Sequence, residues 1–217
     1  MPGPPSLRDV LLVALTAAAG WTDALGYAAL GHVFTANMTG NLVLLGLALG
    51  RVEGTTVERS AAALAGFAAG ALAGSAIARG GAASAWPDRV TVALGVEAAL
   101  LAAFAALWVA GGAPDGLVAL AALGMGVQSS AVRRLDVPGV ATTFVTGTIT
   151  ALMAGLAALR ATGGSGRHAA VVTALVAGAV AGALLWSRWP RAAGAGPAAL
   201  VAAVVLSAAW ARRAPTP

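Results

Sequence analysis

Eight apolar stretches alternate along the chain with short polar breaks. The stretches lie at about 8–30, 34–50, 59–79, 89–111, 116–135, 140–160, 168–187 and 196–212. A helix needs about 20 apolar residues to cross a bilayer, and most of the stretches reach that length, although the second is short. The breaks are rich in Gly, Pro and charged residues, which is typical of tight loops. The pattern predicts an all-α, polytopic membrane protein with about eight membrane-embedded segments and six to eight crossings.

The two halves of the chain follow the same pattern. The tripeptide at 39–41 (Thr-Gly-Asn) recurs at 146–148 as Thr-Gly-Thr, 107 residues later, and each interrupts an apolar run. Shifting the first four apolar stretches by 107 residues places them on the last four. We therefore predict two tandem pseudo-symmetric repeats, 1–112 and 113–217, which together form one membrane domain. A duplicated unit with a polar break inside an apolar run is typical of transporters that bind their solute between repeats.

Small residues recur at a spacing of four in the third stretch, at Gly66, Gly70 and Gly74. The seventh stretch carries a similar ladder, formed by Ala174, Gly178 and Gly182. Residues four apart share one helix face, and small side chains on such a face let two helix backbones approach closely. The ladders predict helix–helix packing, either within the chain or between copies of it in a homo-oligomer.

The arginines bear on the number of crossings. Eight crossings would divide them seven to six between the two sides of the membrane, whereas six crossings would divide them nine to four. Because cytoplasmic loops are enriched in basic residues, the second division favours six crossings. Six crossings would make the halves inverted repeats, and eight would make them parallel. Segment length, however, slightly favours eight, because 140–160 is long enough to span.

The amino-acid composition argues against several classes of protein and of binding site. The chain is 59% hydrophobic and 10% charged, whereas soluble domains carry about 25% charged residues. It has no cysteine, which excludes disulfides and thiolate metal sites. The net charge of +5 comes from thirteen scattered arginines that form no basic stripe, so we expect no nucleic-acid partner. The two histidines, His32 and His168, lack the spacing of a metal site, and we expect no metal or cofactor.

The first stretch also has the outline of a signal peptide, since Arg8 precedes the apolar run 11–19. Asp9 within the basic region argues against cleavage. We expect the segment to remain as the first membrane helix, because it continues into polar residues with a predicted role.

Asp23 is the most informative single residue because it lies well inside the first apolar stretch. Placing an ionisable side chain in hydrocarbon costs at least about 2.5–3.5 kcal/mol, so such residues usually face a cavity or a partner. We predict that Asp23 binds solute or carries a coupling proton or cation. The alternative is a structural carboxylate whose charge is satisfied by hydroxyl groups or by an arginine.

The first polar break offers Asn37, Thr39 and Asn41 around a glycine where a helix can begin. Free backbone amides at a helix start bind anions, and amide side chains can orient a solute. The alternative is ordinary N-capping by Asn37 or Thr39, and the two roles can coexist. We therefore place all three residues in the candidate site.

The second half supplies Gln128, Thr143 and Thr146 to the same predicted site. A buried glutamine needs several hydrogen-bond partners, whereas a threonine can satisfy itself within its own helix. Two further candidates are charged. Arg133 and Arg134 are candidate charge partners of Asp23 or of an anionic solute, although interfacial snorkelling would also explain them. Glu97, about a third of the way into the fourth stretch, is a candidate second proton site, and snorkelling to the interface is the alternative.

The long motifs of the two halves, residues 20–41 (Gly-Trp-Thr-Asp-Ala-Leu-Gly-Tyr through Met-Thr-Gly-Asn) and 125–148 (Met-Gly-Val-Gln-Ser-Ser through Thr-Gly-Thr), resemble the YoaK-type family of bacterial membrane proteins, domain of unknown function 1275. The resemblance covers essentially the whole chain. It implies a helical protein of the bacterial inner membrane and carries over no activity. Members of the family commonly carry Asn where this chain has Ser129, so the resemblance does not imply an amide pair here.

These features predict a small secondary transporter for an unidentified small solute, with its site between the repeats and with proton coupling as one option. The alternatives are a membrane scaffold or partner-binding subunit and a passive channel. We expect no enzyme, since an intramembrane active site would have to rely on Asp23 or Glu97 alone.

Overall fold

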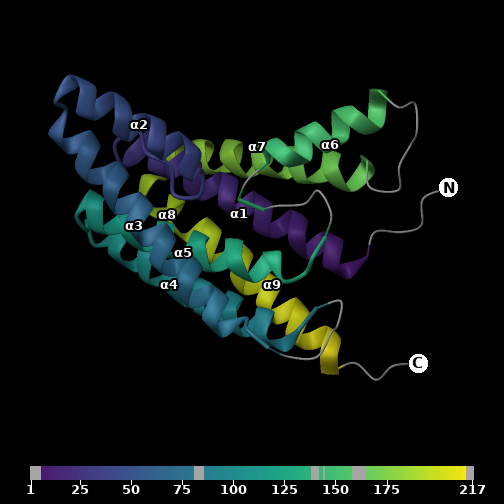
Figure 1. The fold of residues 1–217 in the computed structure, drawn as a ribbon. Coiled ribbons are helices and arrows are strands. Elements are labelled where there is room, and N and C mark those ends of the chain that lie inside the picture. Colours follow the sequence, from purple (N-terminus) through teal and green to yellow (C-terminus); the bar gives the residue numbers. More distant parts are fainter. Residues whose placement is uncertain (1–5, 81–85, 138–141, 144, 158–164, 214–217) are drawn as a thin grey trace.

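The computed structural model describes residues 6–80, 86–137, 142–143, 145–157 and 165–213 (Figure 1). Within these ranges all regular elements are helices, and the predicted all-α fold is confirmed. The helices are α1 (Leu7–Ala29), α2 (Met38–Arg51), α3 (Gly54–Ile77), α4 (Asp88–Val109), α5 (Pro114–Arg133), α6 (Thr146–Ala157), α7 (Ser165–Arg188), α8 (Pro190–Ala193) and α9 (Ala195–Arg213).

Six segments in the described part of the chain are long and apolar enough to cross a membrane. They are α1, α3, α4, α5, α7 and the combined α8–α9 segment. Helix α2 has 14 residues and extends about 21 Å, less than the roughly 30 Å of a hydrocarbon core. Six is the lower limit of the predicted range. In the second stretch, residues 34–37 are a loop and the helix begins only at Met38. The length argument for eight crossings depended on 140–160, where the structure describes helix over Thr146–Ala157 and residues 158–160 lie outside the described ranges.

The two short helices both begin inside the bundle. Figure 1 shows α2 and α6 starting near its middle and running outward toward opposite ends. After α1, the backbone turns back at Gly31 and His32, which have φ of 94° and 61°, and residues 33–37 lead inward to the start of α2. Helix α6 begins at Thr146, six residues later than the apolar pattern predicts. The apolar stretch therefore includes its polar approach, which is loop at Thr142 and Thr143.

The principal helix contacts run between the two halves of the chain. Helix α1 lies against α7, and α3 lies against α5. A Cβ atom added at Gly20 or Gly178 would fall under 3.0 Å from the facing backbone in the first pair. The same is true of Gly70 and Gly126 in the second pair. The two glycine ladders therefore lie against helices of the same chain, where small residues allow close backbone approach.

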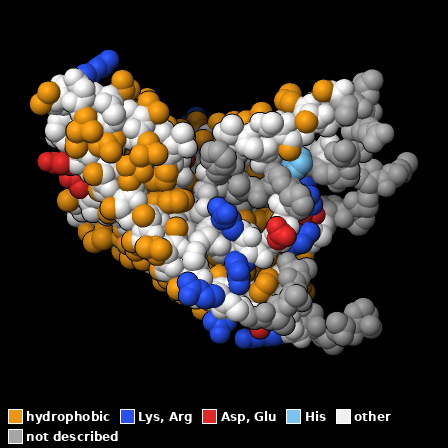
Figure 2. Space-filling view, in the orientation of Figure 1, with side chains coloured by type: hydrophobic (Ala, Val, Ile, Leu, Met, Phe, Trp, Pro, Cys, Tyr) orange, Lys and Arg blue, Asp and Glu red, His pale blue; other side chains and the backbone are white. Residues whose placement is uncertain are grey.

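The interior and the exterior of the bundle are both apolar. Leu12, Leu15 and Leu94 are completely buried between helices. Leu72 and Trp210 are each 74% exposed on outward faces. Figure 2 shows hydrophobic side chains spread over much of the visible surface, while most of the visible arginines gather toward one end. An apolar exterior with charge concentrated at the ends is what a lipid-embedded bundle requires.

Candidate functional site

A cavity of about 480 Å³ lies where the starts of α2 and α6 meet α1 and α7. Its polar lining is Asp23 and Tyr27 from α1, Asn37 before α2, and Thr143 and Thr146 at the start of α6. Four of these were predicted from the sequence, all but Tyr27. The structure thus brings together polar residues from both halves of the chain.

The apolar lining was not predicted. It comes mainly from Phe34, Val145, Ile149, Leu175 and Ala179. The Tyr27 ring stacks on Phe34, with ring centroids 5.5 Å apart and an interplanar angle of 26°. The sequence did contain a signal for Tyr27, because it is the only tyrosine of the chain and lies four residues after Asp23. The α7 residues gave no such signal, because nothing in the sequence indicates that α7 lies beside α1.

The Asp23 carboxylate ties the loop before α2 to the middle of α1. Its Oδ1 accepts hydrogen bonds from the backbone amides of Thr35 and Ala36, both at 2.7 Å, and from the Thr35 hydroxyl at 3.2 Å. All three bonds go to the same oxygen, while the residue also lines the cavity. Asp23 therefore has a structural role and a place in the candidate site at the same time.

The electrostatics of the cavity centre on this carboxylate. Among the described residues that line it, Asp23 is the only charged one. The starts of α2 and α6 both lie at the cavity, and a helix start carries a partial positive charge. Donated amide hydrogens and helix starts both stabilise a carboxylate. Such a group can take up and release a proton or bind a small cation.

Asn37 combines the two roles that the sequence left open. Its Oδ1 accepts a hydrogen bond from the Gly40 amide at 3.3 Å, which makes it the N-cap of α2, and it also lines the cavity. Thr39 is exposed on the first turn of α2 and is not part of the lining.

Asn41 is a structural residue of the same loop. It is completely buried, and its amide group pairs with the Phe34 backbone, accepting from the nitrogen at 2.9 Å and donating to the oxygen at 2.6 Å. This pair of bonds gives the Phe34 backbone the partners that it lacks in the loop, and it ties the loop to the first turn of α2, seven residues further along the chain. The structure thus places Asn41 behind the cavity wall and not on it.

Asn41→Ala should lower the free energy of unfolding by about 2 kcal/mol, because it leaves both backbone groups of Phe34 without their partner. Asn37→Ala, the matched control, should cost only about 1 kcal/mol, the usual value for a helix cap. Thermal unfolding of the purified variants in detergent measures both. Equal losses would contradict the distinction.

Gln128 lies in the core and outside the cavity. It is completely buried, and its Nε2 donates to the Leu15 carbonyl at 3.2 Å and to the Thr142 hydroxyl at 2.8 Å. The residue therefore links α5 to α1 and to the approach of α6. Its partner Thr142 directly precedes the cavity residue Thr143, so Gln128 helps to hold this part of the cavity lining in place.

The two arginines at the end of α5 lie apart from Asp23. Arg133 is exposed, and the Arg134 Nε donates to the Ala78 carbonyl at 3.1 Å, next to the C-terminus of α3. A basic side chain at a helix C-terminus satisfies unpaired carbonyls and complements the helix dipole. No ion pair to Asp23 occurs among the described residues.

Glu97 is completely buried in α4 and faces Gly124 of α5. Within the described ranges, neither of its carboxyl oxygens has a hydrogen-bond partner. The side-chain oxygen of Gln128, one turn along α5 from Gly124, is also buried and unpartnered. An isolated charge in such a place would be very costly, so we expect Glu97 to be a neutral carboxylic acid.

Glu97 should therefore react with dicyclohexylcarbodiimide, an apolar reagent that modifies protonated carboxyl groups in membrane interiors. We expect an adduct on the peptide that contains Glu97, located by mass spectrometry, and its loss in Glu97→Gln. The exposed carboxylate of Asp115, which pairs with Arg59, is the internal control and should stay unmodified. Absence of the Glu97 adduct in folded protein would contradict the neutral form.

Among the described residues, no cluster of three or more histidine, cysteine or acidic side chains could hold a metal ion.

Comparison with known proteins identifies the family. Residues 11–208 match the family described as "Protein of unknown function (DUF1275)". The UPF0700 transmembrane protein YoaK of Bacillus subtilis (strain 168) is 41% identical over 148 residues, which cover 67% of this chain and 66% of that protein. The aligned part is thus slightly less than two thirds of the relative. No solved structure matches the chain.

Proposed function

For this chain, which belongs to the DUF1275 family of proteins, we propose the function of a small secondary transporter in the bacterial inner membrane. The observation that carries the proposal is the cavity of about 480 Å³ that the starts of α2 and α6 share with Asp23. Pockets of about 300–1,000 Å³ hold small molecules, so the volume suits a small solute. Asp23 is the coupling or solute-binding carboxylate, and Asn37, Thr143 and Thr146 complete the polar lining.

The arrangement of the helices supports this proposal. Each half contributes three helices of crossing length and one short helix that begins inside the bundle. Three crossings per half would insert the halves in opposite orientations, as in inverted-repeat transporters. Six crossings also give the division of nine arginines to four that the positive-inside rule favours.

The glycine contacts support a repeat relation between the halves. Gly178 of α7 approaches the Ala17 carbonyl of α1, and Gly70 of α3 approaches the Leu123 carbonyl of α5. A sequence shift of 106 to 108 residues relates the members of the first contact to those of the second. The same shifts relate the contact of Gly20 with Leu175 to that of Gly126 with Phe67. Two interfaces built from corresponding residues are what a duplicated unit would produce.

Cysteine accessibility tests the proposal directly, because the chain has no cysteine of its own. Thr146→Cys places one thiol at the cavity. A membrane-impermeant maleimide is then applied to right-side-out and inside-out vesicles. We expect labelling from at least one side, since a transporter needs a hydrated site. Leu72→Cys on the apolar exterior should stay unlabelled, and Glu53→Cys between α2 and α3 should label from one side only.

The alternative functions give different results. A scaffold needs no hydrated cavity, so an unlabelled Thr146→Cys beside a labelled Glu53→Cys would overturn the proposal. A channel would label from both sides and show steady conductance in a planar bilayer. Labelling without such conductance supports a transporter.

A further inference from the structure

A second cavity, of about 400 Å³, lies between the start of α1 and the end of α9. Leu7, Leu11, Ala208 and Ala211 make it largely apolar, and the side chains of Arg8 and Arg212 add two cations. Leu7 and Ala211 also line a neighbouring cavity of about 400 Å³, formed with Leu206 and Trp210 on the outer side of α9. Because the two cavities share Leu7 and Ala211, we treat them as one groove that leads from a basic end to an apolar face.

Only some of the arginines at this end of the bundle have an acidic partner. Arg212 pairs with Asp88, and Arg167 pairs with Asp9 at 3.5 Å. Arg8 is half-buried, and its side chain makes no ion pair or hydrogen bond with any described residue. A partly buried cation without a counter-charge favours the binding of an anion.

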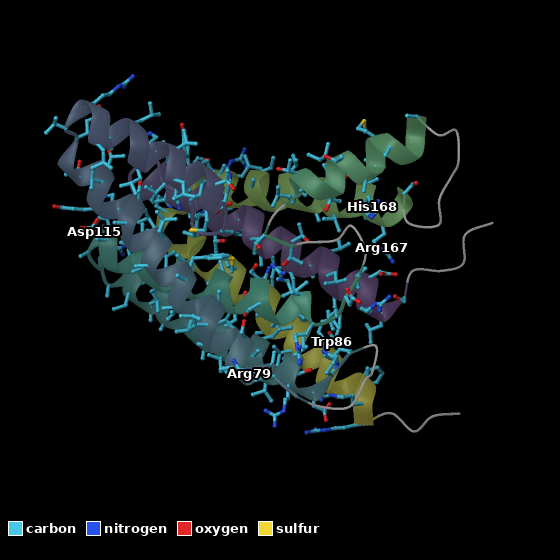
Figure 3. All side chains as sticks on the ribbon, viewed as in Figure 1. Arg79, Trp86, Asp115, Arg167 and His168 are labelled. Carbon is cyan, nitrogen blue, oxygen red and sulfur yellow. The ribbon has the colours of Figure 1, made fainter. Side chains whose placement is uncertain are left out.

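The position of the groove matches the membrane surface. Figure 3 labels Trp86, which also lines the cavity, close to the end of α9, with Asp115 at the opposite end of the bundle. Tryptophan side chains favour the headgroup level of a bilayer. Leu206 and Trp210 are 70% and 74% exposed, so the apolar part of the groove opens on the exterior that faces lipid.

We propose that this groove binds one anionic phospholipid, with the headgroup phosphate at Arg8 and Arg212 and an acyl chain along Leu206 and Trp210. Basic pockets between membrane helices bind anionic lipid headgroups in this manner. The apolar continuation of the groove favours a lipid over a soluble phosphate, because only a lipid would cover it. This site is separate from the cavity at Asp23 and does not depend on transport.

Native mass spectrometry of delipidated protein in detergent tests the site. The ligands are phosphatidylglycerol and phosphatidylcholine with identical acyl chains. We expect wild-type protein to bind phosphatidylglycerol at least about fivefold more tightly, and Arg8→Gln to lose most of that preference. Arg51→Gln removes the same charge at the opposite end of the bundle and should keep it. An equal affinity of wild-type protein for both lipids, or an unchanged preference in Arg8→Gln, would overturn the proposal.

Two further measurements separate a lipid from a soluble anion and guard against misfolding. Glycerol 3-phosphate in excess should fail to displace phosphatidylglycerol, and full displacement would indicate a site for soluble phosphate esters instead. If Arg8→Gln unfolds, the wild-type preference should still fall as salt is raised, because salt screens a phosphate–arginine contact. A preference that is insensitive to salt would overturn the role of Arg8.

Discussion

Asp23→Asn is expected to reduce solute-driven proton movement to background while the protein stays folded. Asparagine keeps an oxygen that can accept the Thr35 and Ala36 amide hydrogen bonds, so the loop before α2 remains tied to α1. It cannot, however, bind or release a proton at the cavity. The substitution therefore separates the structural role of the residue from its proposed chemical role.

Proteoliposomes that contain a pH-sensitive dye measure this effect. Pools of small solutes are added outside, and a pool that moves protons with wild-type protein is retested with the variant. Asp9→Asn is the matched control, because Asp9 pairs with Arg167 at the start of α1, away from the cavity. Wild-type flux through a folded Asp23→Asn protein would show that this carboxylate does not couple transport.

Gly70→Ala is expected to destabilise the protein by about 1–3 kcal/mol, whereas Gly95→Ala should stabilise it slightly. A Cβ at Gly70 would clash with the Leu123 backbone, which cannot move without separating α3 from α5. Gly95 lies in α4, where a Cβ would meet no neighbouring atom within 4 Å. The higher helix propensity of alanine should therefore raise the stability of the protein. The two identical substitutions thus have opposite expected signs.

Thermal unfolding in detergent measures the change in stability of both variants, and Gly178→Ala provides a second test. Gly178 meets the Ala17 backbone in the α1–α7 pair, so it should behave like Gly70. If Gly70→Ala proved as stable as Gly95→Ala, the close approach of α3 and α5 would be wrong.

The fold class followed from the sequence because apolar runs of membrane length leave few alternatives to helices. Run length was less informative inside the bundle. The runs at 34–50 and 140–160 each contain a loop, since Asn41 and Asp23 satisfy the backbone of the first one with side-chain bonds. The crosswise contacts of α1 with α7 and of α3 with α5 were not predicted, because hydropathy does not specify which helices are neighbours.

The candidate site was predicted in part. Asp23, Asn37, Thr143 and Thr146 line one cavity. The position of a charge inside an apolar stretch had indicated Asp23, and the polar breaks had indicated the other three. Asn41 and Gln128 had the same polar character, but both are completely buried in supporting contacts. Polarity alone cannot separate a residue that faces a cavity from one that bonds to a nearby loop, since both need partners away from water.

Helices that are neighbours in the finished bundle are synthesised far apart in time. Helix α1 is complete at Ala29, but α7, which packs along it, begins only at Ser165. At about 5–20 residues per second, a ribosome needs roughly 7–27 s to supply that partner. During this interval α1 carries Asp23 into the membrane without the wall that α7 later provides. We therefore expect correct biogenesis to depend on an insertase that shelters α1 until translation is nearly finished.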